Sequence, residues 1–257
     1  MIRVLYVGDA AGVLGPRFIA SPFNLENKGF SIHIWCQPVL DALRADGEIE
    51  VTHMTNWDAY RDFPKTPEEF KKYNVVFLSD VESEVLLLYP EWTKAPMGPN
   101  RLKSLRDYVA DGGALCMVGG WSSFSGRFGT AAYQNTPVEE ALPVNCIPAG
   151  DDRVETPEGT WIEVVDSGHP VTRGIPWDKC PCFLGYNRII AKDGANVLAR
   201  TKGKGDPFIV VWEFKKGRAM AFASDVSPHW AVAFQKWEYY GQFFRQMVRW
   251  LARADHA

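Results

Sequence analysis

The order of apolar and helical segments predicts an α/β fold with a doubly wound, mostly parallel sheet. Three observations carry this prediction. Short apolar runs typical of buried parallel strands recur along the first half of the chain, helical segments separate them, and the runs end in loops that contain Gly or Asp. Strands that alternate with helices in this way form a parallel sheet with helices on both faces.

The first strand and its neighbours are placed by their residue types. Residues 2–7 (IRVLYV) are mostly β-branched, aromatic or aliphatic, and they end at a glycine and an aspartate, which predicts a buried strand. A long loop follows. Apolar side chains at helical spacing then predict a helix within residues 35–47, and the alternating run 49–54 (IEVTHM) predicts the next strand. The chain is therefore expected to open with a βαβ unit whose two strands are parallel.

Two more helices, each followed by a strand, complete the predicted parallel strands of the sheet. A threonine cap followed by proline predicts a short helix over residues 66–73, and the apolar run 74–80 (NVVFLSD) predicts the strand after it. Residues 100–110 (NRLKSLRDYVA) predict a helix closed by Asp-Gly-Gly. Residues 114–120 (ALCMVGG) then predict a fourth buried strand.

The second half of the chain is expected to add strands of mixed direction. Residues 136–144 (TPVEEALPV) predict a short helix. Residues 159–176 predict a strand and then a turn, and residues 196–225 predict two or three strands joined by Gly-rich turns. Apolar and aromatic side chains at helical spacing predict that a terminal helix over residues 237–254 docks on the sheet. The whole chain, residues 1–257, is expected to form a single domain.

Charge and hydropathy exclude two classes of partner. The formal net charge is −3 and the basic residues are scattered, so nucleic acid is not an expected partner. No apolar run approaches the roughly 20 residues that span a bilayer, so a membrane is not expected as a partner either. The first ten residues predict a strand and not a secretion signal, and a cytoplasmic location is expected.

The numbers of cysteine and aromatic residues indicate which cofactors and which oligomeric state to expect. The five cysteines are odd in number and are expected to be reduced thiols. The Cys-Pro-Cys run at 180–182 has no second ligand pair at zinc spacing, so neither a metal nor a cofactor is expected. Ten Trp, nine Tyr and fifteen Phe indicate a ring-rich core and an oligomer interface, so the protein is expected to be a homo-oligomer.

The expected ligand pocket lies where the parallel strands end, because open α/β sheets bind ligands at the carboxyl ends of their strands. This rule selects the loops that begin near Gly8, Ser79, Gly119 and Ser224. A small molecule is the expected partner.

Two of these loops carry the expected chemistry. Residues 222–230 (FASDVSPHW) place Asp225 and His229 close together, and a histidine beside a carboxylate can act as a general base. His229 and Asp225 are therefore the predicted catalytic residues. Asp80 ends a strand and is a predicted binding residue. The structural alternatives are a turn-capping role for Asp80 and a His229 satisfied by a backbone carbonyl.

Further binding residues are expected from the turn after the fourth strand and from two polar segments, 150–159 (GDDRVETPEG) and 183–189 (FLGYNRI). For the arginine in the first of these segments, a structural ion pair with a neighbouring acid is the alternative. The complete predicted set of substrate-binding residues is Asp80, Gly119, Gly120, Trp121, Ser122, Ser123, Arg153, Tyr186 and Asn187.

The order of these segments resembles a known family. The runs VLYVGD, NVVFLSD, DGGALCMVGGWSSFSG, NTPVEEALPV, GDDRVETPEG, FLGYN and SDVSPHW together resemble the glutamine amidotransferase-like family of bacterial cytoplasmic proteins. This family belongs to the class I glutamine amidotransferase-like superfamily, which also contains the ThuA-like proteins. The resemblance covers nearly the whole chain and implies a flavodoxin-like sheet with a pocket at the strand ends.

The resemblance also implies a catalytic pattern from which this chain departs. Active members of the superfamily carry a cysteine on a tight elbow after a strand, with a histidine and an acid from a later strand end. Here the elbow falls at about Gly120, where no thiol stands, and Cys116 lies earlier in the apolar run. His229, with Asp225, matches the position of the superfamily's histidine, although no acid follows it.

Three functions stay open at this point. The first is an amidotransferase-like enzyme without the elbow cysteine that acts on a small polar metabolite, such as a sugar or amide derivative. The second is a non-catalytic module for ligand binding or assembly. The third is a true glutaminase that uses Cys116. A serine nucleophile at Ser122 or Ser123 would need a base within hydrogen-bond reach and has no G-x-S-x-G frame.

Overall fold

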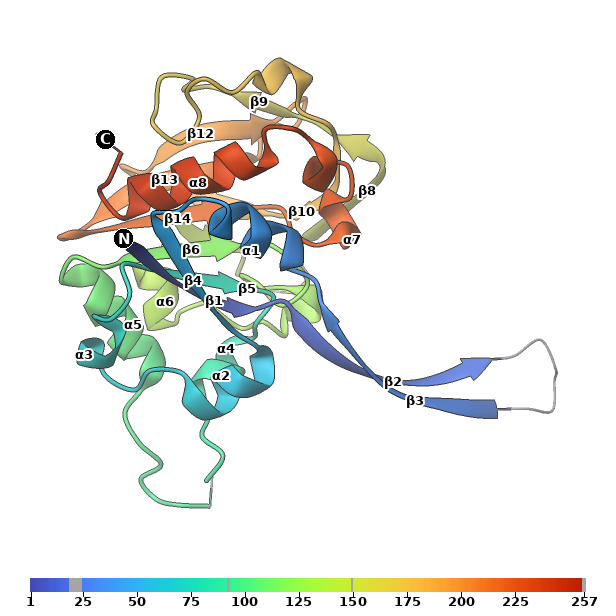
Figure 1. Ribbon diagram of the computed structural model, residues 1–257, viewed down its shortest axis with the longest axis vertical. Coiled ribbons are helices and arrows are strands. Elements are labelled where there is room, and N and C mark those ends of the chain that lie inside the picture. Colours follow the sequence, from blue (N-terminus) through green and yellow to red (C-terminus); the bar gives the residue numbers. More distant parts are fainter. Residues whose placement is uncertain (19–24, 92, 149, 256–257) are drawn as a thin grey trace.

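An eight-stranded sheet forms the centre of the protein (Figure 1). The computed structural model describes residues 1–18, 25–91, 93–148 and 150–255, and it describes the backbone alone over residues 12–18 and 25–30. Five parallel strands come first across the sheet: β4 (Ile49–Met54), β1 (Ile2–Gly8), β5 (Val75–Ser79), β6 (Ala114–Val118) and β14 (Gly217–Phe222). Three antiparallel strands continue it: β13 (Pro207–Phe214), β12 (Asn196–Thr201) and β9 (Ile162–Val164).

This order confirms the predicted doubly wound, flavodoxin-like α/β sheet with mixed strands in the second half. The direction of strand order reverses at β1, since β4 lies on one side of it and β5 on the other. Every residue of β5 and β6 is buried, which explains why their sequences are continuous apolar runs and not alternating ones. The carboxyl ends of β1, β5, β6 and β14 therefore meet at one edge of the sheet.

Helices cover both faces of the sheet (Figure 1). On one face α1 (Gln37–Arg44) packs beside α8 (Tyr240–Leu251). The opposite side carries α2 (Asn56–Asp62), α3 (Pro67–Phe70), α4 (Ser83–Leu87), α5 (Arg101–Ala110) and α6 (Pro137–Ala141). Side-chain caps fix where several helices begin, because Thr55, Thr66, Asn100 and Thr136 each accept a hydrogen bond from a backbone N–H in the first turn. Among the described residues, no helix combines the length and the apolar character of a membrane-spanning segment.

Smaller elements complete the second half. Two antiparallel pairs lie outside the main sheet: β7 (Val144–Cys146) with β11 (Ile189–Ala191), and β8 (Arg153–Thr160) with β10 (Phe183–Asn187). One further helical turn, α7 (Pro228–Ala231), follows β14. These pairs bring the segments 150–159 and 183–189 together, so the two polar segments singled out in the sequence are neighbours in space.

The predicted long loop between the first strand and the first helix is wrong for most of its length. There β2 (Ala10–Phe18) and β3 (Leu25–Ile34) form an antiparallel ribbon that extends away from the sheet (Figure 1). The segment 19–24 of that predicted loop lies outside the described residues. Pro16 lies within this ribbon at a register shift between Leu14 and Pro16, and such irregularities are where strands tolerate proline.

Candidate functional site

Three aspartates stand at the carboxyl ends of the parallel strands. Asp9 follows β1, Asp80 follows β5 and Asp225 lies beyond the end of β14. One carboxylate oxygen from each lies within 4.8 Å of the others. The reversal of strand order at β1 thus places a group of negative charges where α/β sheets bind ligands.

A cavity of about 590 Å³ opens over these aspartates. Its volume is in the range of small-molecule sites. Of the residues predicted from the sequence, His229, Asp225, Asp80, Trp121 and Ser122 all line it. Both predicted catalytic residues and three of the predicted binding residues therefore converge on one cavity.

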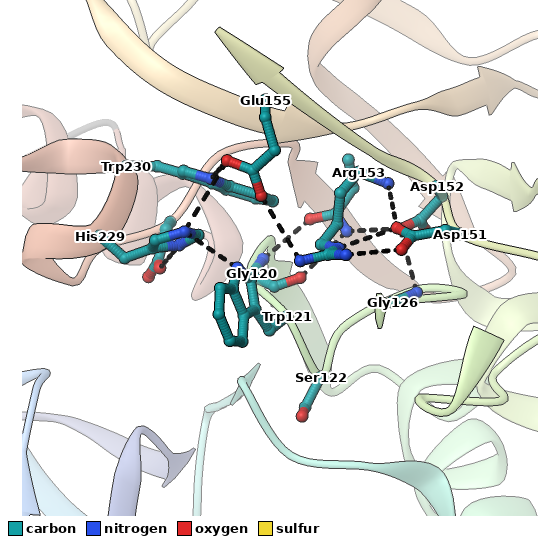
Figure 2. A network of polar contacts seen from close by, with 12 residues as sticks. Gly120, Trp121, Ser122, Gly126, Asp151, Asp152, Arg153, Glu155, His229 and Trp230 are labelled. Atoms are coloured by element: carbon teal, nitrogen blue, oxygen red, sulfur yellow. Dashed lines mark hydrogen bonds and ion pairs between the residues drawn. The ribbon is translucent and has the colours of Figure 1, made fainter. Parts of the chain in front are cut away.

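His229 is held between aromatic and acidic groups (Figure 2). The Trp121 indole Nε1 donates to His229 Nε2 at 2.9 Å, and His229 Nδ1 lies 3.8 Å from Asp225 Oδ2. An indole N–H can only donate, so Nε2 is the acceptor and the imidazole proton sits on Nδ1, facing Asp225. Glu155 Oε2 accepts from Trp230 Nε1 at 3.0 Å and lies 3.8 Å from His229 Nε2.

Asp9 and Asp225 are buried, Asp80 is partly buried, and the three acids lie close together. Burial, followed by the nearby charge of Asp225, raises the pKa of Asp9 to about 7. Burial and the charges of Asp225 and Asp9 raise the pKa of Asp80 well above its usual range. The Tyr6 hydroxyl donates to Asp9 Oδ2 at 2.6 Å and steadies that carboxylate.

The turn after β6 is built around the carboxylate of Asp80. The backbone N–H of Ser122 donates to Asp80 Oδ1 at 2.7 Å, and the backbone N–H of Asp80 donates to Ser123 Oγ at 3.1 Å. Gly120 has a φ of +153°, and a Cβ placed there would lie only 2.2 Å from Asp80 Oδ1. The elbow position therefore holds no side chain because the Asp80 carboxylate fills that space.

Asn187 supports the same turn from behind. Its side-chain Nδ2 donates to the carbonyl oxygen of Gly120 at 3.0 Å and to Asp152 Oδ1 at 2.7 Å, while its Oδ1 accepts from the Gly120 N–H at 2.8 Å. Gly119 donates to the carbonyl oxygen of Phe222 at 2.8 Å, which joins the turn to β14. These predicted binding residues shape the elbow and lie outside the cavity lining.

The other predicted binding residues also lie outside the cavity lining. Ser123 is 1% exposed and caps Asp80 as described. Arg153 binds Asp151 at 2.6 Å and lies over the Trp121 ring, 5.1 Å from its centroid. Tyr186 is fully buried, and its hydroxyl donates to Asp206 Oδ2 at 2.6 Å. Arg153 can act on the site through Trp121, whereas Tyr186 packs inside the fold.

Seven lining residues were not in the predicted set, and those with polar or aromatic side chains are Asp9, Trp35, Asn56 and Ser227. Asp9 had a usable signal, because the strand-end rule selects its loop. Asn56 had none. Its side chain bridges two strand ends, since it accepts from the Ala10 N–H at 3.1 Å and donates to the carbonyl oxygen of Asp80 at 2.7 Å. That role depends on a meeting of loops that only the fold creates.

Cys116 lies in the interior of the sheet and does not line the cavity. It is 0% exposed, and its Sγ contacts Met247 Sδ at 3.6 Å. Burial raises the pKa of the Cys116 thiol well above its usual range, so the reactive thiolate is scarce at neutral pH.

This burial predicts the pattern of alkylation in the native protein. Iodoacetamide should modify the partly exposed Cys182 and leave Cys116 unmodified, because alkylation needs an accessible thiolate. Peptide mapping by mass spectrometry reads both sites in one sample, and alkylation in urea serves as the control for full reactivity. Modification of native Cys116 as fast as Cys182 would contradict this placement.

The sheet order and the strand-end site define an α/β protein of the flavodoxin-like type, and the comparisons with known proteins identify its family. A family model described as "Putative glutamine amidotransferase" (GATase1_like) matches residues 27–253, so the chain belongs to this family. None of the curated proteins matches the chain.

The solved structures that are similar to the chain include two Salmonella proteins and one ThuA-like protein. Cytoplasmic Protein STM3548 from Salmonella typhimurium is 33% identical, with a TM-score of 0.88, over 96% of this chain and 98% of its own. Cytoplasmic Protein STM1381 from Salmonella typhimurium LT2 is also 33% identical with a TM-score of 0.88, over 97% and 99%. A ThuA-like protein from Parabacteroides merdae ATCC 43184 is 11% identical, with a TM-score of 0.55 over 98% and 90%, and shares the fold.

Proposed function

We propose that this family member binds a small polar metabolite in the strand-end cavity and acts on it through proton transfer by His229, without a thiol nucleophile. The observation that carries the proposal is the position of the Asp80 carboxylate at the elbow after β6. Asp80 Oδ1 lies 2.2 Å from the place where a Gly120 Cβ would stand, so this turn presents a carboxylate where the superfamily pattern has a cysteine.

The position of Cys116 supports the same conclusion. A thiol at this depth in β6 would have to leave the sheet interior to reach a ligand in the cavity, and the glutaminase alternative depends on it. Ser122 lines the cavity, but among the described residues no hydrogen bond joins its hydroxyl to His229. Neither side chain is arranged as an activated nucleophile.

His229 is arranged for general acid–base chemistry. Its Nε2 carries a lone pair, and its Nδ1–H faces the buried carboxylate of Asp225, which favours the positive charge that forms when the imidazole accepts a proton. A hydroxyl or amide of the ligand takes the place of the Trp121 indole as the partner of Nε2. Trp121 therefore acts as a movable cover over the base.

The cavity lining supports a polyhydroxylated or amide-bearing ligand, such as a sugar or amide derivative. Two indole rings, Trp35 and Trp121, line it beside carboxylates. Aromatic rings pack on the apolar faces of a small ligand, and carboxylates accept hydrogen bonds from its hydroxyl or amide groups. A cytoplasmic metabolite is expected because both Salmonella relatives carry the description of cytoplasmic proteins.

A non-catalytic binding module is the second candidate, and one observation favours it. Trp121 already occupies the lone pair of His229 Nε2, which a base needs free. If that hydrogen bond persists when the ligand is bound, the cavity recognises a metabolite without turning it over. The homo-oligomer expected from the aromatic content stays a prediction.

A metabolite screen followed by one substitution tests the proposal. A ligand that binds the native state raises its melting temperature, so a thermal-shift screen of sugars, sugar acids and amides identifies the bound class. His229→Gln should keep that rise and lower turnover by about 100-fold or more, the usual contribution of a general base. Turnover is followed by product detection in NMR.

The matched control is His169→Gln, because His169 packs against Trp250 and lies outside the cavity lining. It should leave turnover unchanged. Equal turnover in His229→Gln and the parent would contradict the catalytic role of His229. Saturable binding without any product from the parent would decide for the binding module.

A further inference from the structure

The spacing of the three strand-end aspartates matches a coordination sphere. Ca²⁺ binds oxygen ligands at about 2.3–2.6 Å, so two ligands of one ion lie at most about 5 Å apart. The oxygens of Asp9, Asp80 and Asp225 lie within 4.8 Å of one another. Three carboxylates from separate strands thus already fit around one ion, and Mg²⁺ or Mn²⁺ would need only a small closer approach.

Two buried polar atoms without a hydrogen-bond partner, Asp9 Oδ1 and Ser79 Oγ, lie at the same strand ends, and they are an independent sign of a ligand. Among the described residues, four buried side-chain polar atoms have no hydrogen-bond partner: Asp9 Oδ1, Ser79 Oγ, Tyr240 OH and Arg101 Nε. Ser79 precedes Asp80 and pairs across the sheet with Gly8, so its side chain stands at the strand ends.

These atoms are deeply buried. Asp9 is 1% exposed, Ser79 0% and Tyr240 4%. A buried polar atom without a partner costs free energy and calls for an explanation such as an ion. Asp9 Oδ1 belongs to the carboxylate group and Ser79 directly precedes Asp80, whereas Arg101 lies on α5 and Tyr240 on α8.

Donors outside the group orient each carboxylate. Tyr6 holds Asp9 Oδ2 and leaves Asp9 Oδ1 without a partner, while the Ser122 N–H holds Asp80 Oδ1. The Ser227 N–H donates to Asp225 Oδ1 at 2.7 Å, and the Ser227 hydroxyl donates to Asp225 Oδ2. Such outer hydrogen bonds are what fix metal-ligating carboxylates in proteins.

The charge of the group is not balanced by protein cations. Among the described side chains, no Lys or Arg forms an ion pair with any of the three aspartates, and His229 is the basic group nearest to them, 3.8 Å from Asp225. Three carboxylates held together without a positive charge repel one another. A bound cation removes this repulsion and gives Asp9 Oδ1 a partner.

We infer that Asp9, Asp80 and Asp225 bind one hard divalent cation of the Mg²⁺, Mn²⁺ or Ca²⁺ class in the cavity. All three ligands are oxygen atoms, which this class of ion prefers. Three protein ligands leave coordination positions for water and for ligand oxygens. The site goes beyond the proposed function, because proton transfer by His229 requires no ion.

Calorimetric titration of the full chain with MnCl₂, MgCl₂ or CaCl₂, after dialysis against a chelator and then into chelator-free buffer, tests this inference. The parent should bind one ion per chain with at least one of the three salts. Asp80→Asn, which keeps the shape of the side chain, should weaken that binding at least about tenfold. Asp111→Asn is the control for net charge, since Asp111 is exposed and pairs with Lys71 at the surface, and it should bind like the parent.

A second readout separates lost binding from lost folding. In chelated buffer Asp80→Asn should melt no lower than the parent, because it removes repulsion among buried carboxylates, yet added ion should no longer raise its melting temperature. The inference is overturned if the parent shows no saturable binding up to about 10 mM, above the dissociation constants of weak protein Ca²⁺ sites. It is also overturned if both Asp80→Asn and Asp9→Asn bind like the parent. Either result leaves the role of His229 to its own turnover test.

Discussion

Replacement of Gly120 by alanine should lower the free energy of unfolding by about 2–4 kcal/mol, from backbone strain together with overpacking. The new Cβ would stand 2.2 Å from Asp80 Oδ1, at a φ of +153° that side chains rarely adopt. Either the turn or the Asp80 carboxylate must move. Urea unfolding followed by circular dichroism measures the loss, and ligand binding should weaken with it.

Two further variants separate the two causes of this loss of stability, which are the contact of the new Cβ with Asp80 and the backbone strain. Gly112 also has a positive φ, +118°, but nothing lies within 4 Å of a Cβ placed there. Gly112→Ala should therefore cost only the strain, about 1–2 kcal/mol. In the double variant Gly120→Ala with Asp80→Ala, part of the loss should return, since the colliding oxygen is gone. Equal losses in Gly120→Ala and Gly112→Ala would show that Asp80 does not fill the elbow.

Asn187→Asp should be strongly destabilising, by about 3 kcal/mol at pH 8, the scale of an uncompensated buried charge. Asn187 Nδ2 donates to Asp152 Oδ1 at 2.7 Å, and the substitution replaces this donor with a second buried acid. Burial already raises the pKa of Asp152 to about 6, and a neighbouring acid raises it further.

The loss should depend on pH in a defined direction. A folded-state pKa above the unfolded value of roughly 3.9 means that the folded protein binds a proton more tightly, so its stability falls as the pH rises through the folded pKa. Asn187→Asp should therefore cost less at pH 5 than at pH 8, as urea unfolding at both values would show. Asn196→Asp is the matched control, because exposed Asn196 donates to Asp166 at 3.3 Å, and it should cost less than about 1 kcal/mol at either pH. A loss in Asn187→Asp that does not change with pH would argue against a raised pKa for these buried acids.

Much of the fold could be predicted because its strands are fully buried. Runs such as 74–80 and 114–120 can be continuous and apolar only if helices cover both faces of the sheet, and that requirement fixes the fold class. The β2–β3 ribbon could not be predicted in the same way. It pairs only with itself, and the described part of it joins no other sheet, so its sequence carries no pattern of one buried face.

The site was predictable to the extent that it depends on strand ends. The loop rule found Asp80, Trp121, Asp225 and His229, because parallel strands bring their carboxyl ends together whatever the loops contain. The loop rule could not distinguish residues that line the cavity from residues that only stabilise the surrounding turns. Asn187 is polar and close to the site, yet its amide is used up on the Gly120 backbone and on Asp152, and only the geometry shows this.

The position of β14 in the sheet has a consequence for how the site comes into being as the chain folds. β14 pairs with β6, for example Met220 with Cys116, although most of the second half of the chain separates them. Pairings between such distant segments form slowly, because a long stretch of chain must be closed before the contact is made. Asp225 reaches the site only when β14 has paired with β6. Asp9 and Asp80 follow the neighbouring strands β1 and β5, which are synthesised earlier. We therefore expect the cavity to be completed late, because a nascent chain that ends before β14 lacks the third aspartate of the site.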